Sequence, residues 1–142
     1  MGSSASGFTA LGCLISTDIF NIGACKYAVT DLISMANSTH RFEEFYLDYL
    51  IGNIETEYKE YLKRSPIENV NSINVQLILF HGLKDKVISS DQSIAIKDEL
   101  LKRGIPVQIN LFENEGHGFK DGKIKIDVLK KTEAFFRQYL NI

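Results

Sequence analysis

Apolar and polar residues recur along this chain with two different periods. Between residues 5 and 16, Phe8, Leu11, Leu14 and Ile15 are spaced three and four apart, which predicts a helix with one apolar face. Residues 75–80 are a nearly continuous apolar run, typical of a strand that is buried on both faces of a sheet. Residues 22–29 are a short run that fits a mostly buried strand, and residues 107–112 are predicted to form another strand. The pattern therefore alternates between helix and strand.

Two further helices are predicted after the second and third apolar runs. Residues 91–103 form the first, with Ser90 as N-cap, Gly104 as the C-terminal stop and Pro106 beyond it. The last helix carries one apolar stripe, formed by Val128, Leu129, Thr132, Phe135, Phe136, Tyr139 and Leu140. Strand–helix alternation at this spacing predicts an α/β fold, with a parallel sheet of three strands covered by helices in an αβα sandwich.

Residues 30–64 differ from the rest because they combine aromatic and charged side chains. Their spacing predicts two or three short helices, interrupted near Gly52 and Asn53 and ended before Pro66. This segment is interpreted as a cap-like insertion. Its aromatic residues are expected to form the core of the cap helices rather than a ligand cage: Phe42, Phe45, Tyr46, Tyr49, Tyr58 and Tyr61.

Composition excludes several classes of function. Apolar residues make up 44% of the 142 positions and the formal net charge is −2, so no electrostatic feature favours nucleic acid or an anionic membrane as a partner. The N-terminus lacks the pattern of a signal peptide, and no apolar run is long enough to span a membrane. Cys13 and Cys25 lie within apolar patterns and are expected to be buried free thiols, although a disulfide between them is possible. We expect a cytoplasmic protein.

Three loops carry the candidate chemistry. The stretch 2–7, Gly-Ser-Ser-Ala-Ser-Gly, places Ser4 among small residues just before a helix, as in a nucleophile elbow. Asp85 follows the apolar run 75–80, and His117 follows the run 107–112. Functional groups collect at the carboxyl ends of parallel strands, and the order Ser, Asp, His is that of the α/β-hydrolases.

The residue types suit acyl transfer. A serine hydroxyl needs a base within hydrogen-bond reach, and histidine takes the proton and returns it to the leaving group. A carboxylate orients the imidazole, and the backbone N–H of Ala5, next to the nucleophile, is placed to stabilise an oxyanion.

Simpler interpretations stay open for each of these residues. The first residues could be a flexible terminus, Asp85 an ordinary turn residue and His117 a surface loop histidine. His81 is more consistent with a structural role and His40 with a surface position. No spacing among histidines, cysteines and acids indicates a metal site, and no cofactor is expected.

These segments together resemble the catalytic domain of the prolyl oligopeptidase family of serine peptidases, in its dipeptidyl-peptidase and acylaminoacyl-peptidase branch. The resemblance covers essentially the whole chain. It rests on residues 2–11, the His-Gly-Leu-Lys-Asp run at 81–85 with Val87, residues 103–107, and the Phe-Glu-x-Glu-Gly-His-Gly-Phe run at 112–119, with support from 27–32 and 65–67.

The resemblance implies a role for each candidate. Ser4 would be the nucleophile, Asp85 the orienting acid and His117 the base, acting on short peptides or acyl-peptides. Val29, Leu32 and Tyr46 would line the pocket for the residue before the scissile bond.

Two departures from the family pattern are expected to matter. Ser6 stands where the family elbow usually has glycine, and its hydroxymethyl group is expected to crowd the turn. Residues 1–142 would form only the C-terminal half of an α/β-hydrolase domain, with the N-terminal half, the strand that enters the elbow and a β-propeller absent.

Three functions therefore remain in view: a serine peptidase, a non-catalytic remnant of one, and an esterase of the wider hydrolase fold. If the preceding strand is missing, segment 22–29 is expected to lie at an exposed sheet edge. Such an edge would favour self-association or pairing with a complementary N-terminal half.

Overall fold

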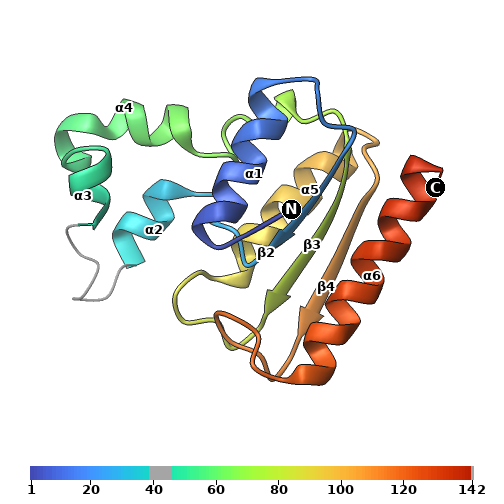
Figure 1. Ribbon diagram of the computed structural model, residues 1–142. Helices are drawn as coiled ribbons and strands as arrows, with labels where there is room; N and C mark the ends of the chain where they lie inside the picture. The colour runs from blue at the N-terminus through green and yellow to red at the C-terminus, as the bar shows by residue number, and fades with distance from the viewer. Residues whose placement is uncertain (39–45, 142) are drawn as a thin grey trace.

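The computed structural model describes residues 1–38 and 46–141 (Figure 1). Within these residues, strands and helices alternate along the chain. In chain order the elements are β1 Gly2–Ser3, α1 Ala5–Ser16, β2 Ile22–Lys26, α2 Leu32–Ser38, α3 Tyr46–Leu50, α4 Ile54–Arg64, the 3₁₀ turn η1 Val70–Ser72, β3 Gln76–Gly82, α5 Ser90–Lys102, β4 Val107–Phe112 and α6 Gly122–Leu140.

The sheet is parallel throughout and has the strand order β1-β2-β3-β4. The predicted three-strand sheet gains a fourth strand, β1, in which Gly2 pairs with Cys25 and Ser3 with Lys26. The expectation that segment 22–29 forms an exposed edge is corrected only at Cys25 and Lys26, where β1 pairs with β2. Among the described residues, no strand pairs with Ile22, Gly23 or Ala24 on that side. A two-residue strand carries no periodicity, and its pairing depends on the neighbouring strand.

Helices cover both faces of the sheet, so the predicted αβα arrangement is confirmed (Figure 1). On one face, α1 and α5 pack against β2 and β3 through a core that includes Leu11, Leu77, Leu79, Ile96 and Leu100. On the other face, α6 packs through Val128 and Phe135 against Ala24, Ile78 and Phe80. The apolar runs of β2 and β3 are explained by burial from both sides.

Helices α2, α3 and α4 form a separate group on the α1 side of the sheet (Figure 1). Asn53 caps α4 by accepting a hydrogen bond from the N–H of Glu55, next to the predicted break. The expected aromatic core is wrong for three residues, because Tyr49 is 87% exposed and Tyr46 and Tyr58 are about half exposed. Tyr61 is fully buried and donates a hydrogen bond to the carbonyl of Gly52. Phe42, Phe45 and His40 lie outside the described residues.

Several predicted boundaries are confirmed and others shift by a residue or more. The bounds of α1 and β4 agree with those predicted, whereas β2 ends at Lys26 instead of residue 29. Helix α5 is capped by Ser89, which accepts from the N–H of Asp91, so the assignment of Ser90 as N-cap is wrong. On α6, Leu129 is 65% exposed and does not belong to the buried stripe.

Both cysteines are free, which excludes the disulfide alternative for this structure. Cys25 is buried in the sheet, and this burial raises the pKa of its thiol to about 12. Cys13 is only partly buried. None of the helices in the described ranges is long and apolar enough to cross a membrane.

Two glycines of α1 allow the packing of this helix to be tested. A Cβ atom on Gly7 would lie 2.5 Å from the Cβ of Ala28, whereas a Cβ on Gly12 would meet nothing within 4 Å. We expect Gly7→Ala to lower the free energy of unfolding by about 1–3 kcal/mol through overpacking. Gly12→Ala should raise it by roughly 0.5–1 kcal/mol, because alanine favours the helix. Urea unfolding of both variants measures the difference, and equal effects would contradict the close packing of α1 on Ala28.

Candidate active site

Ser4 occupies a sharp turn between β1 and α1. Its backbone has φ 52° and ψ −123°, a strained conformation for a residue with a side chain. Gly2 makes the turn possible, because a Cβ atom there would collide with the carbonyl group of Ser6. The predicted context of an elbow, a small-residue turn that leads directly into a helix, is present.

Ser6 does not crowd this turn, contrary to expectation. Its side chain is exposed, and its hydroxyl donates to the carbonyl of Ser3 at 2.7 Å and accepts from the N–H of Ser3 at 3.0 Å. These two bonds link the strand and helix arms of the turn, so the departure from glycine adds a constraint at this position. Sequence reasoning missed it because the direction of a hydroxyl depends on the folded turn.

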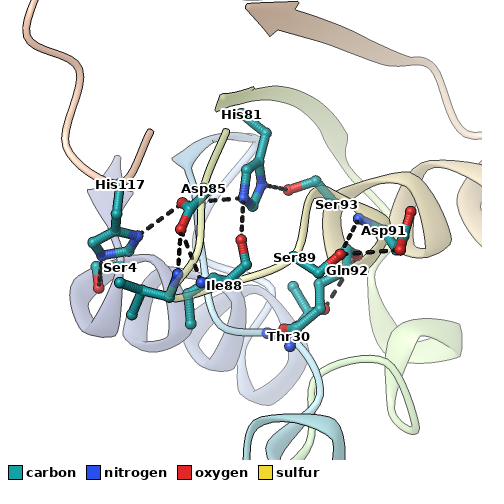
Figure 2. A network of polar contacts seen from close by, with 11 residues as sticks. Ser4, Thr30, His81, Asp85, Ile88, Ser89, Asp91, Gln92, Ser93 and His117 are labelled. Carbon is teal, nitrogen blue, oxygen red and sulfur yellow. Dashed lines mark hydrogen bonds and ion pairs between the residues drawn. The ribbon is translucent and has the colours of Figure 1, made fainter. Parts of the chain in front are cut away.

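The structure brings Ser4, His117 and Asp85 together in one hydrogen-bonded row (Figure 2). The Oγ of Ser4 lies 2.9 Å from Nε2 of His117, and Nδ1 of His117 lies 2.8 Å from Oδ2 of Asp85. An ionised carboxylate only accepts hydrogen bonds, so Nδ1 carries the proton and Nε2 accepts from the serine hydroxyl. The imidazole thus has the tautomer of a base for Ser4.

Both carboxylate oxygens of Asp85 accept hydrogen bonds. Its side chain is fully buried, which by itself raises its pKa. Hydrogen bonds from His117, His81 and the backbone N–H groups of Ile88 and Val87 outweigh this effect and hold the pKa of Asp85 well below its usual range. Asp85 is therefore ionised in the folded protein at neutral pH.

The loop that carries His117 is fastened by Glu115, which sequence reasoning did not single out. The Glu115 carboxylate is buried and accepts from the N–H groups of Lys120 at 2.7 Å and Asp121 at 3.0 Å. Gly82, at the end of β3, allows the loop to approach, because a Cβ there would collide with the carbonyl of Glu115. An acid two residues before the histidine, in a glycine-rich loop, is the signal that could have indicated this role.

Tyr27 supports the histidine ring from the side of β2. Its ring lies edge-on to His117, with the centroids 4.8 Å apart, and edge-on to Phe119 at 5.0 Å. Tyr27 has a positive φ of 36°, which turns the chain sharply at the end of β2. Neither the turn nor the contact leaves a periodic pattern, so the sequence did not indicate this residue as part of the site.

A pocket of about 520 Å³ opens beside Ser4 and His117. The three residues suggested for substrate binding, Val29, Leu32 and Tyr46, all line it. Sequence reasoning missed most of the other lining residues, which come from α1, from the insertion and from the loop after β3. These lining residues include Phe8, Met35, Leu47, Arg64 and Ile88. The volume suits a small organic group, and the wall is mainly apolar.

The wall of this pocket is fixed by buried polar contacts. The side-chain oxygen of Gln92, on α5, accepts from the backbone N–H of Thr30 at 2.8 Å (Figure 2). The same oxygen accepts from the N–H of Asp31 at 3.1 Å. Ser65 accepts from the N–H of Leu32 at 3.0 Å and donates to the carbonyl of Tyr61. Val29 and Leu32 therefore flank a segment that α5 and the end of α4 hold in place.

The remaining candidates can also be placed. Ala5 is the first residue of α1, so its N–H is one of those that a helix leaves without an intrahelical acceptor. It lies beside Ser4 at the pocket. His81 is fully buried, at the end of β3. Among the described residues, no group of three or more His, Cys, Asp or Glu side chains could hold a metal ion.

Comparison with known proteins gives a consistent set of relatives. Dipeptidyl aminopeptidase BIII of Pseudoxanthomonas mexicana is 27% identical over 146 residues, which cover 99% of this chain and 21% of that protein. A solved puromycin hydrolase is 34% identical with a TM-score of 0.94, covering 99% of this chain and 22% of that one. A puromycin-hydrolyzing peptidase of Mycobacterium tuberculosis is also 34% identical, with a TM-score of 0.94. The match covers 98% of this chain and 22% of that one.

Acylaminoacyl peptidase of Pyrococcus horikoshii, at 22% identity and a TM-score of 0.87, shares the fold over 97% of this chain and 23% of its own. The chain thus spans about a fifth of the length of the relatives that it matches. The model of the prolyl oligopeptidase family matches residues 1–142, and the chain therefore belongs to the prolyl oligopeptidase family.

Proposed function

We propose that this chain carries the active site of a serine peptidase that cleaves short peptides through an acyl-enzyme. The observation that carries the proposal is the row of two hydrogen bonds from Ser4 to His117 to Asp85, with the serine on a strained turn. Membership of the prolyl oligopeptidase family supports it. The names of the relatives, among them a dipeptidyl aminopeptidase and puromycin hydrolases, suggest short peptides or aminoacyl amides as substrates.

The geometry suggests a sequence of proton transfers. As Oγ of Ser4 bonds to the substrate carbonyl carbon, its proton passes to Nε2 of His117 and negative charge develops on the carbonyl oxygen. The N–H of Ala5 would donate to that oxygen. When the C–N bond breaks, His117 gives the proton to the departing amine. Water then repeats the sequence on the ester, which releases the acid and restores Ser4.

The pocket beside Ser4 would hold the side chain that precedes the scissile bond. Its wall of Val29, Leu32 and Tyr46 favours an apolar group. Arg64 also lines it, but its Nε is 3.2 Å from Oε2 of Glu60, so part of its charge is balanced within α4. A cytoplasmic location stays a prediction from the sequence.

Reaction with a fluorophosphonate probe tests the proposed nucleophile. We expect stoichiometric phosphonylation of Ser4, no labelling of Ser4→Ala, and a rate lower by about 10⁴-fold or more in His117→Ala, because the hydroxyl then has no base. Peptide mapping by mass spectrometry identifies the labelled residue. A folded parent chain that stays unlabelled would favour the non-catalytic remnant. Faster turnover of simple acyl esters than of aminoacyl anilides would favour the esterase.

Replacement of Tyr46 tests the pocket, with Tyr49 on the same helix as a matched control. Tyr46 lines the pocket, whereas Tyr49 is 87% exposed and is not among its lining residues. We expect Tyr46→Ala to raise KM for anilides of apolar aminoacyl groups by about tenfold, equivalent to ~1.4 kcal/mol of lost contact. Tyr49→Ala should leave KM unchanged. Equal KM values for the two variants would exclude Tyr46 from substrate binding.

Asp85→Asn tests the charge that the site keeps buried. The folded pKa of Asp85 lies below its ordinary value of 3.8, so its ionised form contributes stability above that pH. The contribution is lost as the pH falls through the folded pKa. We expect Asp85→Asn to cost about 1–3 kcal/mol in the free energy of unfolding at pH 7. Urea unfolding should show this deficit shrinking below about pH 3.8; a deficit independent of pH would contradict the assignment.

A further inference from the structure

His81 is a buried histidine that the proposed reaction does not use directly. It is the penultimate residue of the inner strand β3 and is fully buried. Its Nδ1 lies 2.7 Å from Oγ of Ser93 on α5, and its Nε2 lies 3.0 Å from the carbonyl oxygen of Ile88. The same Nε2 lies 3.4 Å from Oδ2 of Asp85 (Figure 2).

The contacts of His81 determine which nitrogen carries a proton. Nε2 faces two oxygens that only accept hydrogen bonds, the carbonyl of Ile88 and the carboxylate of Asp85. Nε2 must therefore be protonated. Without its proton, Nε2 would itself be an acceptor, and three buried acceptors would face one another with no donor among them. In the neutral ring Nδ1 is then the acceptor, and the hydroxyl of Ser93, which both donates and accepts, supplies the proton for that bond.

His81, Ile88 and Asp85 form a closed set of contacts. Oδ1 of Asp85 accepts from the N–H groups of Val87 and Ile88, each at 2.9 Å, while His81 holds the carbonyl of the same Ile88. Oδ2 of Asp85 faces His117 on one side and His81 on the other. The N–H of His81 thus fixes both the carboxylate and the loop that carries it. If the carboxylate rotated, Oδ2 would lose both imidazole partners at once.

We propose that His81 is a positioning residue for the proposed reaction: its Nε2–H keeps Oδ2 of Asp85 directed at His117. The inference rests on the proposed function, because orientation of Asp85 matters only if His117 acts as a base. A purely structural role makes a different prediction. Replacing His81 would then lower activity only through the loss of stability. Any other variant of this buried cluster with the same loss of stability would lose the same activity.

Three variants separate the two roles. His81→Asn keeps an amide near the place of Nδ1, within reach of Ser93, but has no group at the place of Nε2. His81→Gln reaches further and places an amide N–H near Nε2. Ser93→Ala removes the partner of Nδ1 and leaves Nε2–H in place, so it disturbs the same buried cluster without touching Asp85.

The maximal rate of fluorophosphonate labelling is the first measurement. We expect a loss of about tenfold in His81→Asn, typical of outer partners of catalytic groups, with the half-saturating probe concentration unchanged. His81→Gln and Ser93→Ala should keep rates close to the parent, although Ser93→Ala is destabilised. Parent-like labelling of folded His81→Asn, or losses in all three variants that follow stability alone, would overturn the proposal. If His81→Asn does not fold, a tenfold loss in folded His81→Gln would overturn it.

The second measurement does not depend on activity. The NMR resonance of the His117 Nδ1 proton reports its bond to Asp85, and we expect it to shift in His81→Asn and to stay in place in Ser93→Ala. If the parent chain is not labelled, the proposed function fails while this comparison still tests His81. A resonance that is unchanged in His81→Asn would exclude the positioning role whether or not the chain is active.

Discussion

The site depends on parallel strands that end at one edge of the sheet. Ser4 and His117 are separated by 113 positions in the sequence, yet their side chains are 2.9 Å apart. They meet because β1, β2, β3 and β4 run in the same direction, so the segments that follow β1, β3 and β4 emerge side by side. Cores on both faces hold the strands in this register, and every contact of the site depends on that register.

Helices and strands that carry a repeating apolar pattern could be predicted from the sequence. The pairing of the two-residue strand β1 could not. The helix at residues 5–16 and the strand at 107–112 were predicted with their observed bounds, because their apolar patterns arise from burial in the sandwich. The pairing of Gly2 with Cys25 follows from the position of β2 in space. The exposure of Tyr49 likewise depends on how α3 packs, which residue type alone does not determine.

The candidate site shows the same division. Ser4 could be proposed because it stands among small residues just before a helix, and Asp85 and His117 because each follows an apolar run. The three occur in the order of a known fold class. Their supports could not be proposed, since Glu115 and Tyr27 act through a backbone turn and a ring contact that exist only in the folded chain. The sequence therefore indicates the reactive side chains of the candidate site, but not the residues that hold them in place.

In the first turn of helix α5, two neighbouring residues contact different parts of the site. Gln92 holds the backbone of Thr30 and Asp31 beside the pocket, and Ser93 contacts His81, the histidine that adjoins Asp85. One helical turn therefore supports both the proposed substrate pocket and the proposed catalytic acid. Substitutions in α2, α3 and α4 would reach the loop of Asp85 as well, because these helices pack in an apolar cluster with Ile88, whose N–H binds that carboxylate.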